Sequence, residues 1–150
     1  MCVAIRKGTY DVDTFGGLVK RGEDPWHAAK REFKEETDYR LDRIERRCNS
    51  IYEYDYVHPN GHITRIYVKR VRNLPDTKKI TKYMHANYRN RRMEHCYAGT
   101  CLVSEMVKKK ACVIVPIDGG SAFGYGHISY DVRDCVRKST TSLWNSGAFS

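Results

Sequence analysis

A helix that carries a dense group of acidic residues constrains this chain more than any other feature of its sequence. Residues 25–37 contain no helix breaker after their first position. Pro25 has the fixed φ and the missing N–H that suit the start of a helix. Asp24 precedes it and is a residue type that can accept hydrogen bonds from the first turn. We therefore predict a helix over Pro25–Thr37 that is capped by Asp24.

Three carboxylates share one face of this predicted helix, because residues three and four positions apart are neighbours on a helix surface. They belong to Glu32, Glu35 and Glu36. Trp26, Ala29 and Phe33 recur at helical spacing on a neighbouring face, which would dock the helix on a core. Clustered carboxylates suit hard divalent cations such as Mg²⁺. A solvated acidic face on a surface helix is the alternative that these residue types alone leave open.

The order and spacing of the residues around this helix resemble the Nudix box. Gly17 is followed after five residues by Glu23, and after seven more by the run REFKEE at residues 31–36. The family pattern ends with a glycine and an aliphatic residue, where this chain has Asp38 and Tyr39. Aspartate tolerates the left-handed conformation, so we expect the C-terminal turn of the helix to be retained.

The resemblance implies an α/β fold, a Nudix-like α/β/α sandwich with a mixed sheet, formed by residues 1–150 as one domain. It also implies hydrolysis, dependent on Mg²⁺ or Mn²⁺, of a nucleoside diphosphate linked to another group. Arg31 would orient the acidic cluster through Glu23, and Glu35, Glu36 or an acid from later in the chain would accept the proton of the attacking water. The metal ligands implied by position are Gly16, through its carbonyl, Glu32, Glu35 and Glu36.

The chain is also similar to the Nudix mRNA-decapping proteins of large DNA viruses, locally in the box and loosely beyond it. The similarity follows the order of a Ser-Glu-Met run at residues 104–106, an apolar strand at 111–117, a glycine-rich loop at 118–126 and a last helix at 128–144. It makes Glu105 the candidate for the later acid and capped RNA the preferred substrate. Free nucleotides and diphosphoinositol polyphosphates are the alternative substrates within the same enzyme class.

The charge of the chain favours a polyanionic partner. Its 150 residues include 27 basic and 18 acidic side chains, a formal net charge of +9, which attracts nucleotides and nucleic acid. The basic residues 77–92 include Tyr83 and Tyr88, a composition typical of surfaces that bind phosphates and stack on bases. A solvated polar insertion would look the same. A catalytically silent Nudix scaffold that binds RNA is therefore an alternative of another class, and a structural protein that assembles on nucleic acid is a third.

The first residues depart from the family pattern, because only 16 residues precede Gly17. Residues 2–5 suit a buried strand and residues 8–13 a turn-rich connection. We therefore expect either that the sheet lacks an N-terminal strand or that a partner or an upstream segment supplies it. A partner or a dimer would cover an edge that is left exposed. Residues 51–57 and 63–71 alternate on either side of an Asn-Gly turn and predict a hairpin.

The cysteine pattern and the absence of a long apolar stretch bear on the environment of the protein. None of the six cysteines forms a CxxC pair, so we expect free thiols rather than a zinc site or disulfides. His95 with Cys96 and Cys101 is the nearest approach to a zinc-binding group. No stretch approaches the length of a membrane span. These features favour an intracellular, cytoplasmic protein in a reducing environment that does not use a membrane as its partner.

Overall fold

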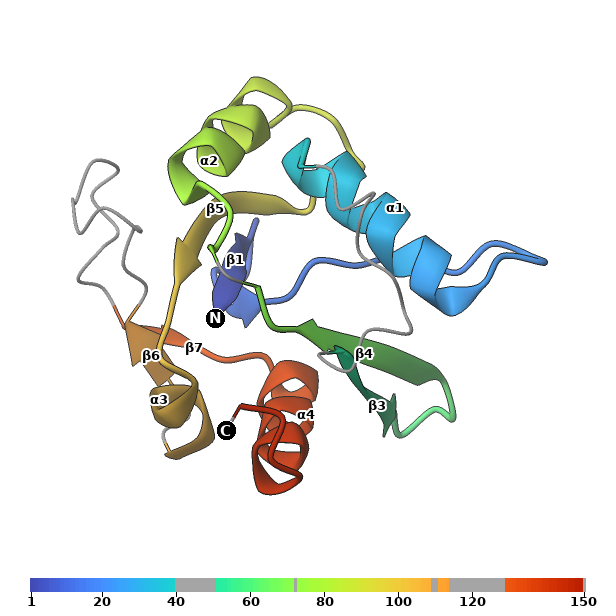
Figure 1. Cartoon of the computed structure of the whole chain (residues 1–150). Helices are drawn as coiled ribbons and strands as arrows, with labels where there is room; N and C mark the ends of the chain where they lie inside the picture. Colours follow the sequence, from blue (N-terminus) through green and yellow to red (C-terminus); the bar gives the residue numbers. More distant parts are fainter. Residues whose placement is uncertain (40–50, 72, 109–110, 114–128, 150) are drawn as a thin grey trace.

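The protein is an α/β structure built around a small antiparallel sheet (Figure 1). The computed structural model describes residues 1–39, 51–71, 73–108, 111–113 and 129–149. The middle strand of the sheet, β1, pairs with β2 on one side and with β5 on the other. The strands are β1 (Cys2–Arg6), β2 (Val12–Asp13), β3 (Ile51–Val57), β4 (Ile63–Lys69), β5 (His95–Thr100), β6 (Ala111–Val113) and β7 (Ser129–Asp131).

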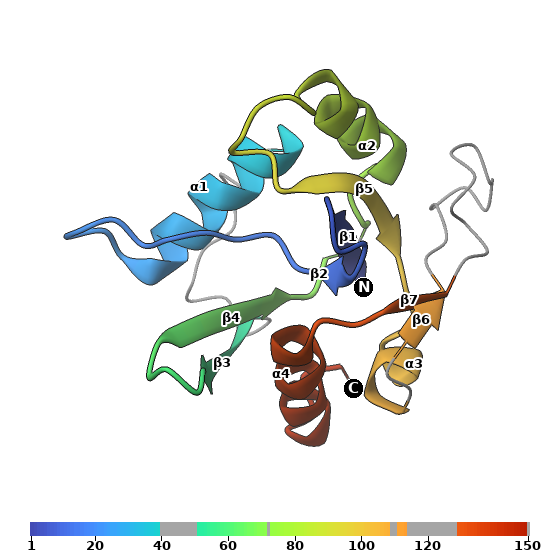
Figure 2. The same ribbon diagram turned by 180° about the vertical axis from the view of Figure 1, so that it is seen from behind.

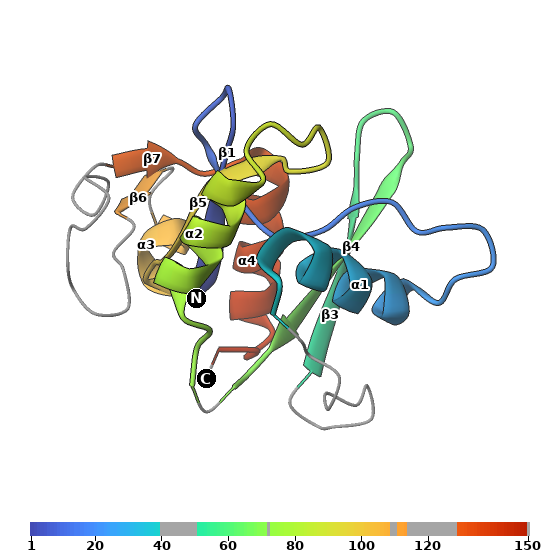
Figure 3. The same cartoon turned by 90° about the horizontal axis from the view of Figure 1, so that it is seen from above.

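Four helices are described around these strands. α1 (Pro25–Thr37) and α2 (Thr77–Ala86) lie side by side, as the view from above shows (Figure 3). α3 (Val103–Lys108) and α4 (Asp134–Asn145) pack on each other at the opposite side of the central sheet (Figure 2). None of the helices in the described ranges is long and apolar enough to cross a membrane.

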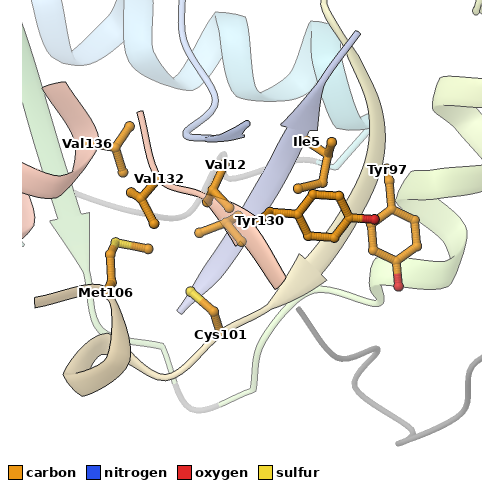
Figure 4. Packing of buried hydrophobic residues seen from close by; sticks show 9 residues of the cluster. Ile5, Val12, Tyr97, Cys101, Met106, Tyr130, Val132 and Val136 are labelled. Carbon is orange, nitrogen blue, oxygen red and sulfur yellow. The ribbon is translucent and has the colours of Figure 1, made fainter. Parts of the chain in front are cut away.

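The two faces of the central sheet carry separate apolar layers because side chains alternate along β1. Val3 and Ile5 face the layer that α3 and α4 cover. Figure 4 shows Ile5 among the residues of this layer. Ala4 faces the other layer, which α2 covers. Their partners in the first layer are Val12, Tyr97, Cys101, Met106, Tyr130, Val132 and Val136, and in the second Ile80, Met84, Met93 and Ala98. The sheet therefore separates the helix pair α1 and α2 from α3 and α4.

The predicted α/β class is confirmed, and among the described residues parallel pairing is limited to one isolated bridge. Every pairing between the strands described above is antiparallel. A parallel contact occurs as an isolated bridge between Val12 and Val132, where the N–H of Arg133 donates to the Val12 carbonyl at 3.0 Å. Residues 8–13, predicted as a connection only, end in the strand β2. Two strands therefore precede α1, and the bridge at Val12 continues the sheet beyond β2.

Helix α1 has the predicted bounds, although its details differ in two respects. Asp24 occupies the N-cap position, but its side chain makes no capping hydrogen bond. Ala28 rather than Ala29 is the buried alanine. At the other end, Asp38 adopts the left-handed conformation with φ 57°, and its N–H donates to the Lys34 carbonyl at 2.8 Å. The aspartate thus ends the helix as a glycine would.

The remaining predicted elements agree with the structure to different degrees. The hairpin is present as β3 and β4 around a turn in which Gly61 has φ 85°. The basic stretch 77–92 forms α2 and the loop after it. The last helix begins at Asp134 instead of residue 128, because β7 precedes it. The apolar strand is described only as β6, and the glycine-rich loop at 118–126 lies outside the described residues.

Candidate active site

Arg31 joins the glycine-containing loop before α1 to the helix itself. Its guanidinium donates two parallel hydrogen bonds to Glu23, at 2.8 and 3.0 Å, and another to the Leu18 carbonyl at 3.0 Å. The N–H of Lys20 also donates to Glu23, at 2.9 Å. The Arg31 hydrogen bond is the main reason that the pKa of Glu23 falls to about 2. The loop is therefore fixed on the helix by an ionised carboxylate.

Glu32 lies against the backbone of Gly17. A Cβ atom at Gly17 would lie 2.3 Å from the carboxyl carbon of Glu32 and 2.4 and 2.5 Å from its two oxygens. Only glycine allows this approach without displacing the side chain. Glu32 also accepts a hydrogen bond from Nη1 of Arg31 at 2.7 Å. At this point the loop therefore packs its backbone closely against a carboxylate.

Glu36 is a buried carboxyl group that faces the same loop. Its side chain accepts a hydrogen bond from the N–H of Gly16 at 3.0 Å, and the residue is only 3% exposed. Its pKa is raised to about 9, mainly by burial and also by the negative charges of Glu94, Glu32 and Asp13, against the opposing effect of the Gly16 N–H. No Lys or Arg in the described part of the chain pairs with Glu36. Positive charge brought to this point would relieve the cost of ionising it.

A second buried group lies directly behind Glu36. Nδ1 of His95 is 3.9 Å from Oε1 of Glu36, and Nε2 of the same ring is 3.3 Å from Oδ2 of Asp13. Asp13 also accepts hydrogen bonds from the N–H of Thr14 at 2.8 Å and from Nη1 of Arg133 at 3.4 Å. Burial opposes ionisation of Asp13, but the His95 hydrogen bond, the charges of His95 and Arg133 and the Thr14 N–H outweigh it and lower its pKa.

Glu35 differs from its two neighbours because it points to solvent. Its side chain is 49% exposed, and its carboxylate lies 3.4 Å from Nη1 of Arg31. Its backbone carbonyl accepts a hydrogen bond from the Tyr83 hydroxyl of α2 at 3.0 Å. The three predicted carboxylates thus range from buried at Glu36, through largely covered at Glu32, to exposed at Glu35. They line the loop side of α1 and do not fan out as a uniform solvated face.

Comparison with known protein families identifies the family to which this chain belongs. The family model described as NUDIX domain matches residues 3–95, which include the loop, α1, α2 and His95. The chain belongs to the Nudix family. Its match covers more than half of the 150 residues. No curated protein and no solved structure matches the chain.

The acidic residues of this Nudix protein offer carboxylate oxygens, which are suitable ligands for a divalent cation. Nudix proteins generally use such an ion, and carboxylate oxygens are the ligands that Mg²⁺ and Mn²⁺ prefer. Glu36 is buried near other negative charges. Glu32 can approach the loop closely because Gly17 has no Cβ atom. Across the described ranges, no three His, Cys, Asp or Glu side chains already converge on one point. Binding would therefore require Glu32 and Glu35 to turn away from Arg31.

Glu105 and Glu94 occupy different sides of the molecule. Glu105 lies on α3, whose Met106 belongs to the apolar layer opposite α1 and α2. No described contact joins Glu105 to the Nudix box. Glu94 precedes β5, and its charge is the first electrostatic contribution that raises the pKa of Glu36. The structure therefore brings Glu94, and not Glu105, near the carboxylates of α1.

Sequence reasoning missed the group formed by Asp13 and His95. The two residues are 82 positions apart, and Arg133 is 120 positions from Asp13. The sequence singles out His95 only beside Cys96 and Cys101, as the nearest approach to a zinc site. A weak signal for the group does exist, because an acid and a histidine stand at the ends of short apolar runs that form strands β2 and β5.

Proposed function

We propose that this Nudix protein hydrolyses the diphosphate bond of a nucleoside diphosphate linked to another group, with Mg²⁺ or Mn²⁺ as cofactor, and that 5′-capped RNA is its preferred substrate. The observation that carries the proposal is the buried carboxyl of Glu36, held by the Gly16 N–H and surrounded by the negative charges of Glu94, Glu32 and Asp13. A purely structural helix would gain nothing from such a group, because a buried carboxyl without a cation costs stability.

Each residue of the box has a role in this reaction. Glu32, Glu35, Glu36 and the Gly16 carbonyl would hold the cation. When bound, the cation supplies positive charge to the diphosphate and makes an attacking water more acidic. Arg31 and Glu23 keep the loop against α1, so that Gly16 and Gly17 stay beside the carboxylates. Water adds its oxygen to phosphorus, the bridging oxygen leaves with the second phosphate, and a carboxylate takes the proton of the water.

Two acids are candidates for accepting that proton. The sequence similarity to decapping proteins favours Glu105, and the arrangement of the chain favours Glu94. Glu94 is exposed to solvent at the start of β5, so a proton passed to it can leave for bulk water. Box carboxylates that are not fully engaged with the cation are a further choice. Substitution of each later acid by glutamine separates the two.

The net charge of the chain supports a long polyanionic substrate. A charge of +9 attracts capped RNA more strongly than a single nucleotide, because a strand presents many phosphates. Free nucleotides and diphosphoinositol polyphosphates contain the same kind of phosphoanhydride bond and are the alternative substrates. The experiment is to incubate the protein with RNA carrying a labelled cap and to follow release of m⁷GDP with Mg²⁺ or Mn²⁺.

Three variants make this experiment specific. Glu35→Gln and Glu36→Gln are each expected to abolish release of m⁷GDP, and Asp131→Asn, an exposed acid on β7, is expected to leave it unchanged. Wild-type protein that cleaves free nucleotides and leaves capped RNA intact would contradict the cap as substrate. Wild-type protein that cleaves none of the three classes of compound would contradict the hydrolase itself.

A catalytically silent RNA-binding protein is the second candidate function. It is favoured by the lack of a converged ligand cluster among the described side chains and by the basic residues of α2. Calorimetric titration with Mn²⁺ separates the two. Heat of binding that disappears in Glu32→Ala supports the hydrolase, whereas RNA binding that is indifferent to Mn²⁺, together with no heat of metal binding, supports the silent scaffold.

A further inference from the structure

We infer that α2 and the loop after it form a binding surface for the single-stranded RNA that follows the cap, separate from the residues that hold the diphosphate. This inference rests on the proposed function, because it supposes that the substrate of the site on α1 continues into an RNA strand. The α2 basic surface, as we name it, consists of Lys79, Lys82, Tyr88, Arg89, Arg91 and Arg92.

The positive charge of the α2 basic surface is not neutralised locally. The sequence contains no Asp or Glu between Asp76 and Glu94. The five basic side chains are exposed, and none of them forms an ion pair with an acid in the described ranges. By contrast, Arg31, Arg65 and Arg137 each pair with a carboxylate. Unpaired cations in one segment create a local positive potential that attracts phosphates.

An exposed aromatic ring lies among these cations. Tyr88 is 51% exposed, and Nζ of Lys7 lies 4.9 Å from the centre of its ring. Lys7 also donates hydrogen bonds to the carbonyls of Tyr88 at 2.8 Å and Asn90 at 3.5 Å, which fixes the loop on the turn after β1. Beside the ring is a hollow of about 410 Å³ lined by His85, Ala86, Tyr88 and Arg89. Proteins that bind single-stranded nucleic acids combine an aromatic ring, on which a base stacks, with basic side chains, which neutralise the phosphates.

The α2 basic surface is rigidly placed next to the catalytic helix. Ile80 and Met84 of α2 are buried against the sheet, and the Thr81 hydroxyl accepts a hydrogen bond from the N–H of Ala98 at 3.0 Å. The Tyr83 hydroxyl donates to the carbonyl of Glu35 at 3.0 Å, so α2 is bonded to the turn of α1 that carries the acids. The two helices lie side by side (Figure 3). A strand held on α2 can therefore begin at the carboxylates of α1.

RNA fits this surface better than an anionic membrane does. A helix that lies on a membrane needs a broad apolar face to insert between lipids. The apolar side of α2 is used up against the sheet, where Ile80 and Met84 are 1% and 0% exposed. Its outer side offers cations and, in the following loop, one exposed tyrosine. Binding to lipid vesicles is accordingly an outcome that the experiment must be able to detect.

The experiment measures binding of a labelled 20-nucleotide RNA with a 5′-hydroxyl by fluorescence anisotropy in EDTA, so that neither a cap nor hydrolysis is needed. The test variant is Arg89→Gln with Arg91→Gln. The matched control is Arg137→Gln with Lys138→Gln, which removes the same charge from α4 on the other side of the sheet. Because each phosphate contact to a single strand contributes about 0.7 to the salt slope, we expect the test variant to lower that slope by about 1.4 and affinity at 0.1 M salt more than tenfold.

A second variant isolates the aromatic contribution. Tyr88→Leu keeps all charges, so it is expected to weaken RNA binding with an unchanged salt slope, because base stacking does not release counterions. Equal losses in the test and control charge variants would overturn the inference. So would absence of RNA binding by the wild type, or binding of phosphatidylserine vesicles in preference to RNA.

Kinetics distinguish failure of this inference from failure of the proposed function. In the test variant, KM for a capped 20-nucleotide RNA should rise, and turnover of a cap dinucleotide, which has no RNA body, should not change. Equal effects on both substrates would overturn the inference and leave the hydrolase intact. RNA binding that depends on Arg89 and Arg91, in a protein that hydrolyses nothing, would remove the proposed function and leave the RNA surface standing.

Discussion

Oε1 of Glu36 and Nδ1 of His95 lie 3.9 Å apart beneath the loop of the Nudix box. Nε2 of the same ring lies 3.3 Å from Oδ2 of Asp13. Nδ1 has no hydrogen-bond partner among the described residues, because 3.9 Å is longer than a hydrogen bond. Burial is the main reason that the pKa of Glu36 is raised to about 9. The surroundings of Glu36 therefore favour its uncharged form until a cation is brought to it.

Replacing Glu36 with glutamine should stabilise the protein when no metal is present. With a folded pKa of about 9 and an ordinary value of 4.5, the wild-type carboxyl must be kept protonated at pH 7 at the expense of folding. Between the ordinary value of 4.5 and pH 7 lie about 2.5 pH units of about 1.4 kcal/mol each, so we expect a gain in unfolding free energy on the order of 3 kcal/mol. Thermal denaturation in EDTA measures it.

The same variant should lose its response to metal. Mg²⁺ or Mn²⁺ should raise the melting temperature of the wild type, since a ligand that binds the folded state stabilises it. Glu36→Gln should show no such rise. A lower melting temperature of Glu36→Gln than of wild type in EDTA would contradict a buried, protonated Glu36 that costs stability.

Adding a single methyl group at Gly17 should disable the site. In Gly17→Ala the new Cβ would occupy the position of the Glu32 carboxylate, which must then move. We expect the rate to fall by up to about one hundredfold, as a displacement of about 1 Å in a catalytic site can cause. Wild-type activity in Gly17→Ala would show that contact between Gly17 and Glu32 has no role.

Arg31→Lys should reduce turnover because lysine cannot make two parallel hydrogen bonds to Glu23 while also reaching Leu18. We expect kcat to fall at least about tenfold with little change in melting temperature, since partly exposed ion pairs contribute about 0 to 1 kcal/mol to stability. Steady-state kinetics and thermal denaturation test this together.

The hairpin provides a matched control for Arg31. Arg65 makes the same paired hydrogen bonds to Asp55, at 2.7 and 3.0 Å, away from the Nudix box. Arg65→Lys should leave kcat unchanged. A fall in kcat of similar size in Arg65→Lys would mean that loss of any such pair on the surface impairs the protein.

Asp13 should make stability sensitive to acid. Its folded pKa is lowered below the ordinary value of 3.8, so its contribution is complete above that value and is lost as pH falls through the folded pKa. Asp13→Asn should lower the free energy of unfolding by about 1 to 3 kcal/mol near pH 6, because it removes a negative charge that His95 and Arg133 stabilise. The difference from wild type should shrink below about pH 4. Urea denaturation across this pH range measures it, and a constant difference would contradict the role of the charge.

Glu94→Gln and Glu105→Gln decide which acid assists the reaction. Glu94 lies close enough to Glu36 to raise its pKa, whereas Glu105 lies on α3 behind the sheet. We expect Glu94→Gln to lower kcat and to change its dependence on pH, and Glu105→Gln to retain wild-type kinetics. The reverse result would support Glu105 as the acid that assists the reaction.

The elements predicted best from the sequence are those whose signals are local. Pro25 at the first helical position and the absence of breakers before residue 37 gave the bounds of α1 correctly. Likewise, Asn60 and Gly61 placed the hairpin turn. The left-handed conformation of Asp38 also followed from its residue type. In each case the neighbouring residues alone determine the conformation.

The elements that were missed depend on distant parts of the chain. β5 has the sequence HCYAGT, without clear alternation or β-branched residues before its end, and it is a strand because β1 lies beside it. β2 has only two residues and exists through the same partner. The neighbourhood of Asp13, His95 and Glu36 likewise arises from tertiary packing, which no spacing in the sequence encodes.

Asp13 accepts a hydrogen bond from Arg133, which lies beyond residue 95, where the family match ends. Val132 and Val136, from the same stretch, fill the apolar layer beneath β1. A shortened gene product that stopped at the border of the matched domain would lack Arg133, one of the cations beside Asp13, and would leave the layer partly open. A stably folded form of this protein therefore needs residues well beyond the end of the family match, because those residues complete its packing and its ion pairs.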